Sequence, residues 1–136
     1  MKAMTMLRQA TIELRDLHLP ASIGSYGPDD VVPDAHILDL DLIISPDLVE
    51  VASDEMGSVF DYDPLIAQIV AIAQRQTFET QEYLMTLITQ ACAGYSEVLG
   101  LAICLRKSPV LAGTGSLGVR LALGAEDLTR LRRMCA

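Results

Sequence analysis

Two stretches near the N-terminus alternate apolar and polar residues, which is the pattern of a β-strand with one buried face. They extend from Ala10 to Leu19, where a β-bulge is expected at residues 16–17, and from His36 to Ile44. Residues 98–105 and 117–123 are shorter apolar runs, and we interpret them as two further strands. The pattern therefore predicts four strands, in two pairs that are separated by the middle of the chain.

The middle of the chain instead has apolar residues at helical spacing, in two consecutive segments. The first predicted helix has Pro64 in its first turn and can be capped by Asp61 or Asp63. Thr80 is the expected N-cap of the second helix, and Gly94 lies near its C-terminal end. The expected buried faces are Leu65, Ile66, Ile69, Val70 and Ile72 in the first helix and Tyr83, Leu84, Leu87, Ile88 and Ala91 in the second.

The predicted elements follow the order strand, strand, helix, helix, strand, strand, with a short terminal helix over residues 126–134. This order predicts an α+β fold, in which a four-stranded antiparallel sheet carries two helices on one face. The length predicts one domain, residues 1–136, with its core at about residues 10–123. Apolar residues make up 51% of the chain, and homo-oligomerisation is the simplest explanation for this excess.

The charge balance limits the classes of partner. With 18 acidic and 10 basic residues, the net charge is −8, and a chain this acidic is not expected to bind nucleic acid. Its apolar runs are too short to cross a membrane. Three cysteines without CxxC spacing indicate reduced thiols in a cytoplasmic protein and no metal site. His18 and His36 are isolated on strands, where a structural role is expected.

Four ionisable residues lie at the edges of predicted elements, where a side chain can reach a cleft while its backbone stays rigid. They are Asp29, Tyr62, Glu82 and Lys107. Each also has an ordinary interpretation: Asp29 suits a turn, and Glu82 would stabilise the positive end of a helix. Together, a carboxylate, a lysine and a tyrosine are the parts of a proton-transfer site for a flat heterocycle.

The order and spacing of these residues resemble the dihydroneopterin aldolase family. Gly24 is followed five residues later by Asp29, where the family usually has Glu. Tyr62 precedes the first helix, as a tyrosine does in the family. The pair Gln81-Glu82 opens the second helix and matches the pair that supplies the pterin-binding glutamate, and Lys107 follows the third strand. The resemblance extends over nearly the whole domain.

The resemblance implies the tunnelling fold, in which four subunits close a ring, two rings usually stack into an octamer, and pockets lie between neighbours. It implies retro-aldol cleavage of 7,8-dihydroneopterin without a cofactor or metal. Gln81, Glu82 and Asp29 would bind the substrate, Lys107 would carry protons, and Tyr62 would take part in both tasks. The product, 6-hydroxymethyl-7,8-dihydropterin, belongs to folate-type pterin synthesis.

Two departures from the family leave alternatives open. Asp29 is one methylene shorter than Glu, which leaves room for a non-catalytic pterin-binding paralogue. Arg106 adjoins Lys107, and only one of these strand neighbours can face a pocket; we favour Lys107. An epimerase acting on dihydroneopterin or its phosphate is a further alternative, although few basic residues are available to hold a phosphate.

Overall fold

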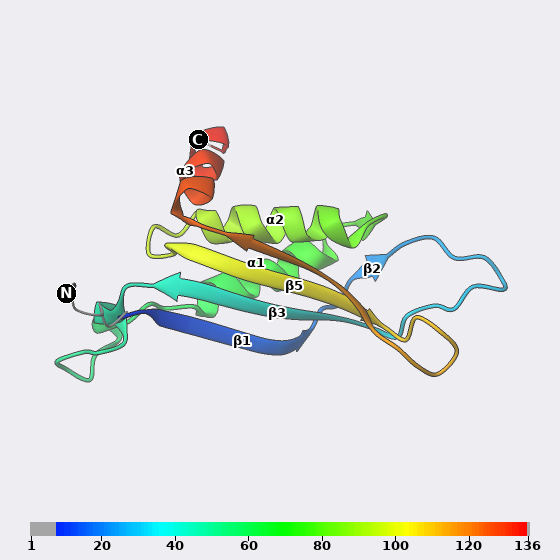
Figure 1. Ribbon diagram of the computed structural model, residues 1–136, viewed down its shortest axis with the longest axis horizontal. Helices are drawn as coiled ribbons and strands as arrows, with labels where there is room; N and C mark the ends of the chain where they lie inside the picture. The colour runs from blue at the N-terminus through cyan, green and yellow to red at the C-terminus, as the bar shows by residue number, and fades with distance from the viewer. Residues whose placement is uncertain (1–7, 136) are drawn as a thin grey trace, which may run out of the picture.

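The computed structural model describes residues 8–135, and its centre is one four-stranded sheet (Figure 1). The strand order is β1-β3-β5-β6, and every pair of neighbours is antiparallel. The strands are β1 (Ala10–His18), β3 (Ala35–Ile44), β5 (Gly100–Ser108) and β6 (Leu117–Leu123). These bounds lie within two or three residues of the predicted ones, and the predicted α+β fold is confirmed.

Two helices, α1 (Asp63–Gln74) and α2 (Gln81–Ala93), pack on one face of the sheet. The third helix, α3 (Ala125–Met134), follows β6 at the opposite end of the molecule from the long loops at residues 24–34 and 109–116 (Figure 1). The predicted cap of α2 is confirmed, because the Thr80 hydroxyl accepts a hydrogen bond from Tyr83 N at 3.1 Å. At α1 the N-cap is Tyr62, and the Asp61 carboxylate accepts from Asp63 N at 3.2 Å.

The core lies between the sheet and the helices. Residues of β3 alternate strictly between buried and half-buried, so that Leu38, Leu40, Leu42 and Ile44 face the helices. The helices meet them with Leu65, Ile69 and Ile72 of α1 and with Leu84, Met85, Ile88 and Cys92 of α2. One predicted core residue is wrong: Tyr83 is 52% exposed. Because α2 is packed against β5, α1 and α3, its buried arc is centred one position further along, at Met85 and Thr89.

The predicted bulge in β1 is present, and it orients a side chain on the sheet face that lies away from the helices. Asp16 has a φ of +57°, and the β1–β3 register shifts between Leu14 and Leu17. The bulge turns the Asp16 carboxylate towards Arg106, which it meets at 2.6 Å, and Arg106 also pairs with Asp39. Burial alone would raise the pKa of Asp39, but the Asp16 N–H and the Arg106 guanidinium lower it below its ordinary value. This face is thus a charged surface, in contrast to the apolar helix side.

Two small strands were not expected from the sequence. The strand β2 (Ser22–Ile23) pairs in parallel with β4 (Thr77–Phe78), which joins the first loop to the connection between α1 and α2. The link between β3 and α1 contains two turns of 3₁₀ helix, η1 (Pro46–Leu48) and η2 (Met56–Ser58). Within residues 8–135, no helix is both long and apolar enough to cross a membrane.

The C-terminal helix is held to the core by the buried Leu128 and by the hydrogen bonds of Arg132. Arg132 donates to the carbonyl oxygens of Ala93 at 2.7 Å, Tyr95 at 3.0 Å and Val98 at 2.7 Å. These carbonyls lie at and beyond the C-terminal end of α2, where backbone acceptors lack partners within the helix and the helix dipole favours a cation.

Arg132→Ala is therefore expected to lower the free energy of unfolding by at least about 1.5–3 kcal/mol, the usual value of a hydrogen bond to a charged group. Urea unfolding at equal protein concentration measures the effect. Arg133→Ala is the matched control, because Arg133 is the exposed neighbour on the same helix. Equal stability of the two variants would show that the three carbonyl contacts contribute little.

Candidate functional site

A cleft of about 220 Å³ lies where β5 ends and α2 begins. It brings together three separate segments: the loop after β2, the start of α2, and the facing ends of β5 and β6. Its lining residues are Ile23, Gly24, Tyr26, Glu79, Thr80, Gln81, Glu82, Lys107, Leu117 and Val119. Three of the predicted site residues, Gln81, Glu82 and Lys107, therefore lie in one cleft.

The small parallel pair β2–β4 positions the wall of this cleft. Gly24 N donates to Phe78 O at 2.7 Å, which extends the pairing by one residue and holds the loop beside the start of α2. Gly24 has a φ of +91°, and a Cβ at this position would lie 3.0–3.1 Å from the Tyr26 ring and hydroxyl. Only glycine combines that backbone conformation with such close packing. Gly24 thus lets the Tyr26 ring close over the loop.

The two residues at the start of α2 differ in burial. Gln81 is 6% exposed, and among the described residues its Oε1 atom has no hydrogen-bond partner. Glu82 is exposed and lies in the first turn of α2, where free backbone N–H groups favour a negative charge. Adjacent positions at the start of α2 therefore place an amide, from Gln81, and a carboxylate, from Glu82, in the lining of the cleft.

Lys107 and Arg106 lie on opposite faces of the sheet. Lys107 follows the helix-facing positions Ile103 and Leu105 at intervals of two residues, and it lines the cleft. Arg106 is engaged on the other face by Asp39 and Asp16. The sequence favoured Lys107 over Arg106 as the residue that faces a pocket, and the structure has Lys107 on the cleft side.

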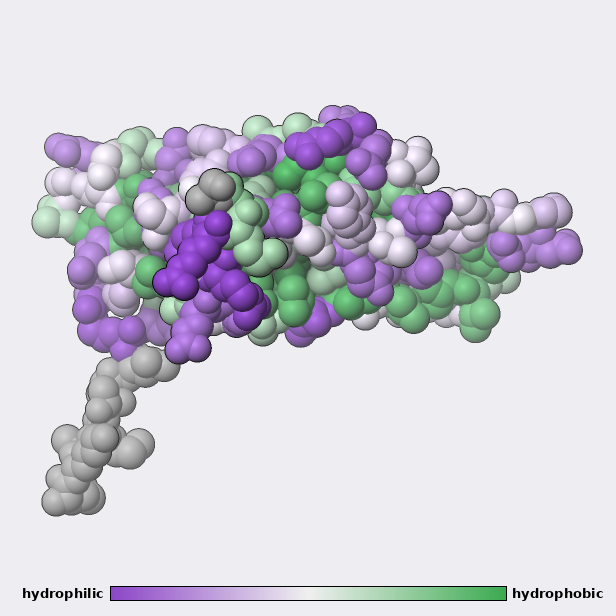
Figure 2. Space-filling view, turned by 90° about the horizontal axis from the view of Figure 1, so that it is seen from above, coloured by the Kyte–Doolittle hydropathy of each residue, from purple (hydrophilic) through white to green (hydrophobic). Residues whose placement is uncertain are grey.

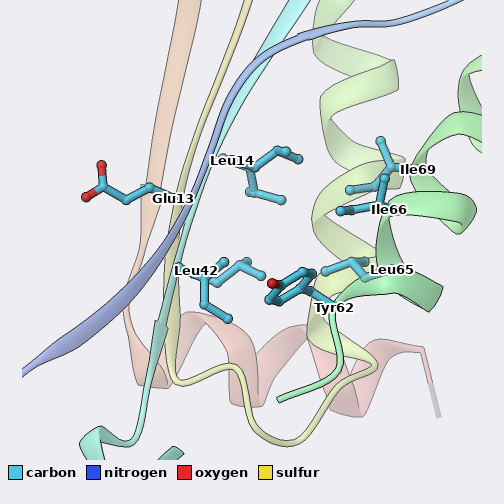
Figure 3. Close-up of a pocket in the computed structure, with 9 residues that line it drawn as sticks. Glu13, Leu14, Leu42, Tyr62, Leu65, Ile66 and Ile69 are labelled. Carbon is cyan, nitrogen blue, oxygen red and sulfur yellow. The ribbon is translucent and has the colours of Figure 1, made fainter. Parts of the chain in front are cut away.

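Tyr62 does not share this cleft within one copy of the chain. It is 48% exposed and lines a different cavity of about 230 Å³, between α1 and the strands β1 and β3. Figure 3 shows its ring near Leu42 and Leu65, whereas the Glu13 carboxylate points away from the cavity. The surroundings of Tyr62 are thus largely apolar, and no other predicted site residue lines that cavity in the described chain.

Asp29 also lies outside the cleft. It is exposed in the loop between β2 and β3, in a turn that is closed by its neighbour. Asp30 N donates to Gly27 O at 3.2 Å, and the Asp30 carboxylate accepts from Gly27 N at 2.6 Å. The turn therefore depends on Asp30, which leaves the Asp29 side chain available for other contacts.

The cleft also contains Tyr26, which sequence reasoning did not select as a site residue. The available signal was its position two residues after Gly24, in a loop rich in Gly, Pro and Asp.

The cysteines do not line this cleft: all three are free, and burial raises the pKa of the Cys92 thiol to about 12. Among residues 8–135, no cluster of His, Cys, Asp or Glu has the arrangement of a metal site.

Comparison with known proteins identifies the family. Residues 12–122 match the sequence model of FolB, dihydroneopterin aldolase, which spans β1 to β6 and leaves α3 outside. No curated protein sequence matches the chain significantly.

Solved structures share the fold at low identity. A dihydroneopterin aldolase from Burkholderia thailendensis bound to guanine has a TM-score of 0.72 and 18% identity, and the match covers 85% of this chain and 91% of that one. The E. coli dihydroneopterin aldolase in complex with neopterin has a TM-score of 0.71 and 16% identity, with coverages of 85% and 99%. Since the family model matches most of its length, the chain belongs to the dihydroneopterin aldolase family.

Proposed function

We propose that this protein cleaves 7,8-dihydroneopterin by a retro-aldol reaction, giving 6-hydroxymethyl-7,8-dihydropterin and glycolaldehyde. The observation that carries the proposal is the cleft in which the Glu82 carboxylate and the Lys107 amine are brought together by α2 and β5. Family membership and the ligands of the related structures, guanine and neopterin, support a flat heterocycle of this kind.

Glu82 is proposed to bind the heterocycle. A pterin presents two adjacent N–H donors at its 2-amino-4-oxo edge, and one carboxylate can accept hydrogen bonds from both. Glu82 lies in the first turn of α2, where the free backbone N–H groups favour a negative charge. The adjacent Gln81 amide is the second proposed contact, because a ligand donor would give its Oε1 atom the partner that it lacks among residues 8–135.

Lys107 is proposed to move the protons. Removal of the 2′-hydroxyl proton forms the aldehyde as the C1′–C2′ bond breaks, and the electron pair passes into the ring C=N bond as an enamine. Protonation of the C1′ carbon then gives the hydroxymethyl group. The ring itself is the electron sink, so a lysine amine that takes one proton and returns one is sufficient.

Tyr62 is proposed to reach the cleft from a neighbouring copy of the chain. Its separation from Lys107 within one copy and its 48% exposure fit a residue that serves a pocket between subunits. Exposed Leu117 and Leu121 on β6, and the apolar surface at the loop end of the molecule in Figure 2, fit burial against such a neighbour. Asp29 would contact the hydroxylated chain of the substrate from its projecting loop.

Subunit complementation tests this assignment. Tyr62→Phe and Lys107→Ala are each expected to be poorly active, and reassembly of an equimolar mixture should restore activity. With random assembly, about one quarter of the interfacial sites would combine an intact Lys107 with an intact neighbouring Tyr62. No recovery in confirmed mixed oligomers would mean that both residues act from the same copy.

One observation favours a second function, that of a pterin-binding protein without aldolase activity. Asp29, the shorter acid, lies outside the cleft in the free chain. The experiment that separates the two functions is incubation with 7,8-dihydroneopterin and detection of both products. The aldolase proposal expects glycolaldehyde and hydroxymethyldihydropterin in equal amounts; tight pterin binding without either product would favour the binding protein.

A further inference from the structure

A buried histidine lies directly beside the lysine of the candidate site. His36 is 7% exposed and stands opposite Lys107 in the β3–β5 pair, on the side of the sheet that faces the helices. Side chains at directly opposed positions of antiparallel strands share one face, with Cβ atoms about 4.5–5.5 Å apart. Within residues 8–135, the buried His36 Nδ1 atom has no hydrogen-bond partner.

The surroundings of His36 favour its neutral ring. Burial lowers the pKa of His36, and the positive charge of Lys107 lowers it further. Tyr26 and Asp34, from the connection between β2 and β3, share with His36 the cleft of about 410 Å³ that adjoins the candidate site. A neutral imidazole has one nitrogen with a free lone pair, which can only accept a hydrogen bond. Buried acceptors normally have a partner.

We propose that His36 is a positioning residue, whose Nδ1 accepts a hydrogen bond from Lys107 Nζ and holds it at the floor of the cleft. Lys107 is the flexible donor on the facing strand, and it has more than one N–H group, so it can keep one bond to His36 while the rest of the amine faces the substrate. The effect on turnover rests on the proposed aldolase function, whereas the pairing itself does not.

The pairing predicts a distinctive dependence on pH. A group with a lowered folded-state pKa gains its proton only below the ordinary histidine value, so the acceptor persists through neutral pH and is lost on acidification. Protonated His36 would then repel the Lys107 ammonium. Turnover should therefore fall on acidification, with a midpoint below the ordinary histidine pKa of 6.5.

Three variants of His36 separate positioning from packing. His36→Asn keeps an acceptor near the place of Nδ1 but does not titrate, so turnover at neutral pH should be retained and the part of the acid limb that His36 contributes should be lost. His36→Leu removes the acceptor and should lower kcat about tenfold with KM unchanged. His36→Gln presents its amide nearer the place of Nε2 and should resemble His36→Leu. Equal losses in the Asn and Leu variants would overturn the proposal.

NMR of the wild-type oligomer with ¹⁵N-labelled histidine tests the pairing without any turnover. We expect His36 to carry its proton on Nε2, and Lys107→Met to raise the pKa of His36 while leaving it below the ordinary value, since burial remains. The other histidine, His18, is exposed. A proton on Nδ1, or a His36 titration that ignores Lys107→Met, would overturn the proposal. The expected spectra in a protein without aldolase activity would uphold the pairing and reject only the proposed function.

Discussion

Replacing Lys107 with Ala is expected to lower turnover by roughly 10²–10⁴-fold, the usual loss when a general acid–base group is removed. Product pterin should bind almost as well as before, because the acceptor proposed for its ring edge, Glu82, is on α2 rather than on β5. Steady-state kinetics and product titration on the same preparation measure both effects. A loss of affinity as large as the loss of turnover would make Lys107 a binding residue instead.

Arg106→Ala is the control that tests which face of the sheet carries the functional side chain. Arg106 pairs with Asp16 and Asp39 on the opposite face, so its removal should leave turnover near the wild-type value and act on stability. Asp39 is partly buried and would lose the cation that lowers the pKa of its carboxyl. An inactive Arg106→Ala protein beside an active Lys107→Ala protein would contradict the assigned face of β5.

Replacing Glu82 with Ala is expected to abolish pterin binding. Two ring donors would lose a charged acceptor, and each such hydrogen bond contributes about 1.5–3 kcal/mol. Together they correspond to a loss of affinity of roughly 10²–10⁴-fold. Titration with neopterin, or with guanine as a ligand that lacks the hydroxylated chain, measures the loss independently of turnover.

Glu79→Ala is the matched control, since Glu79 lines the same cleft from just before α2. It should retain affinity within a few fold, because Glu79 precedes the Thr80 cap and lies outside the first turn of the helix. If Glu79→Ala lost binding while Glu82→Ala kept it, the ring edge would be bound by Glu79, and the assignment to Glu82 would be contradicted.

Local patterns predicted most of the fold because each of them depends only on neighbouring residues. The alternation in β3 decided which of its residues face the helices, and the break at Asp16 and Leu17 decided where β1 bulges. Thr80 could be identified as a cap from its position before an apolar helical segment. Each of these features needs information from only a few adjacent positions.

Features that depend on distant segments could not be predicted in this way. The two-residue strands β2 and β4 are too short to show a periodicity, and each is a strand only because of the other. The exposure of Tyr83 follows from α2 contacting three elements at once, which its own periodicity does not encode. The loop before β3 likewise gave no signal that Asp30, rather than Asp29, closes its turn.

The residues of the candidate site differ in the same way in how far the sequence could place them. Gln81, Glu82 and Lys107 meet within one copy because α2 and β5 pack together, and their assignment to one cleft needed only the fold. Tyr62 lies in another cavity, so its place in the chemistry depends on an interface that a single chain does not contain. The partnership of His36 with Lys107 required the strand register, which sequence alone does not specify.

The central claim is that the cleft at the start of α2 is the pterin site, and a crystal structure of the protein with neopterin tests it most directly. The account predicts the 2-amino-4-oxo edge against the Glu82 carboxylate, Lys107 beside the hydroxylated chain, and Tyr62 from a neighbouring copy closing the site. Neopterin bound instead in the cavity between α1, β1 and β3, with Glu82 and Lys107 free of contact, would contradict it.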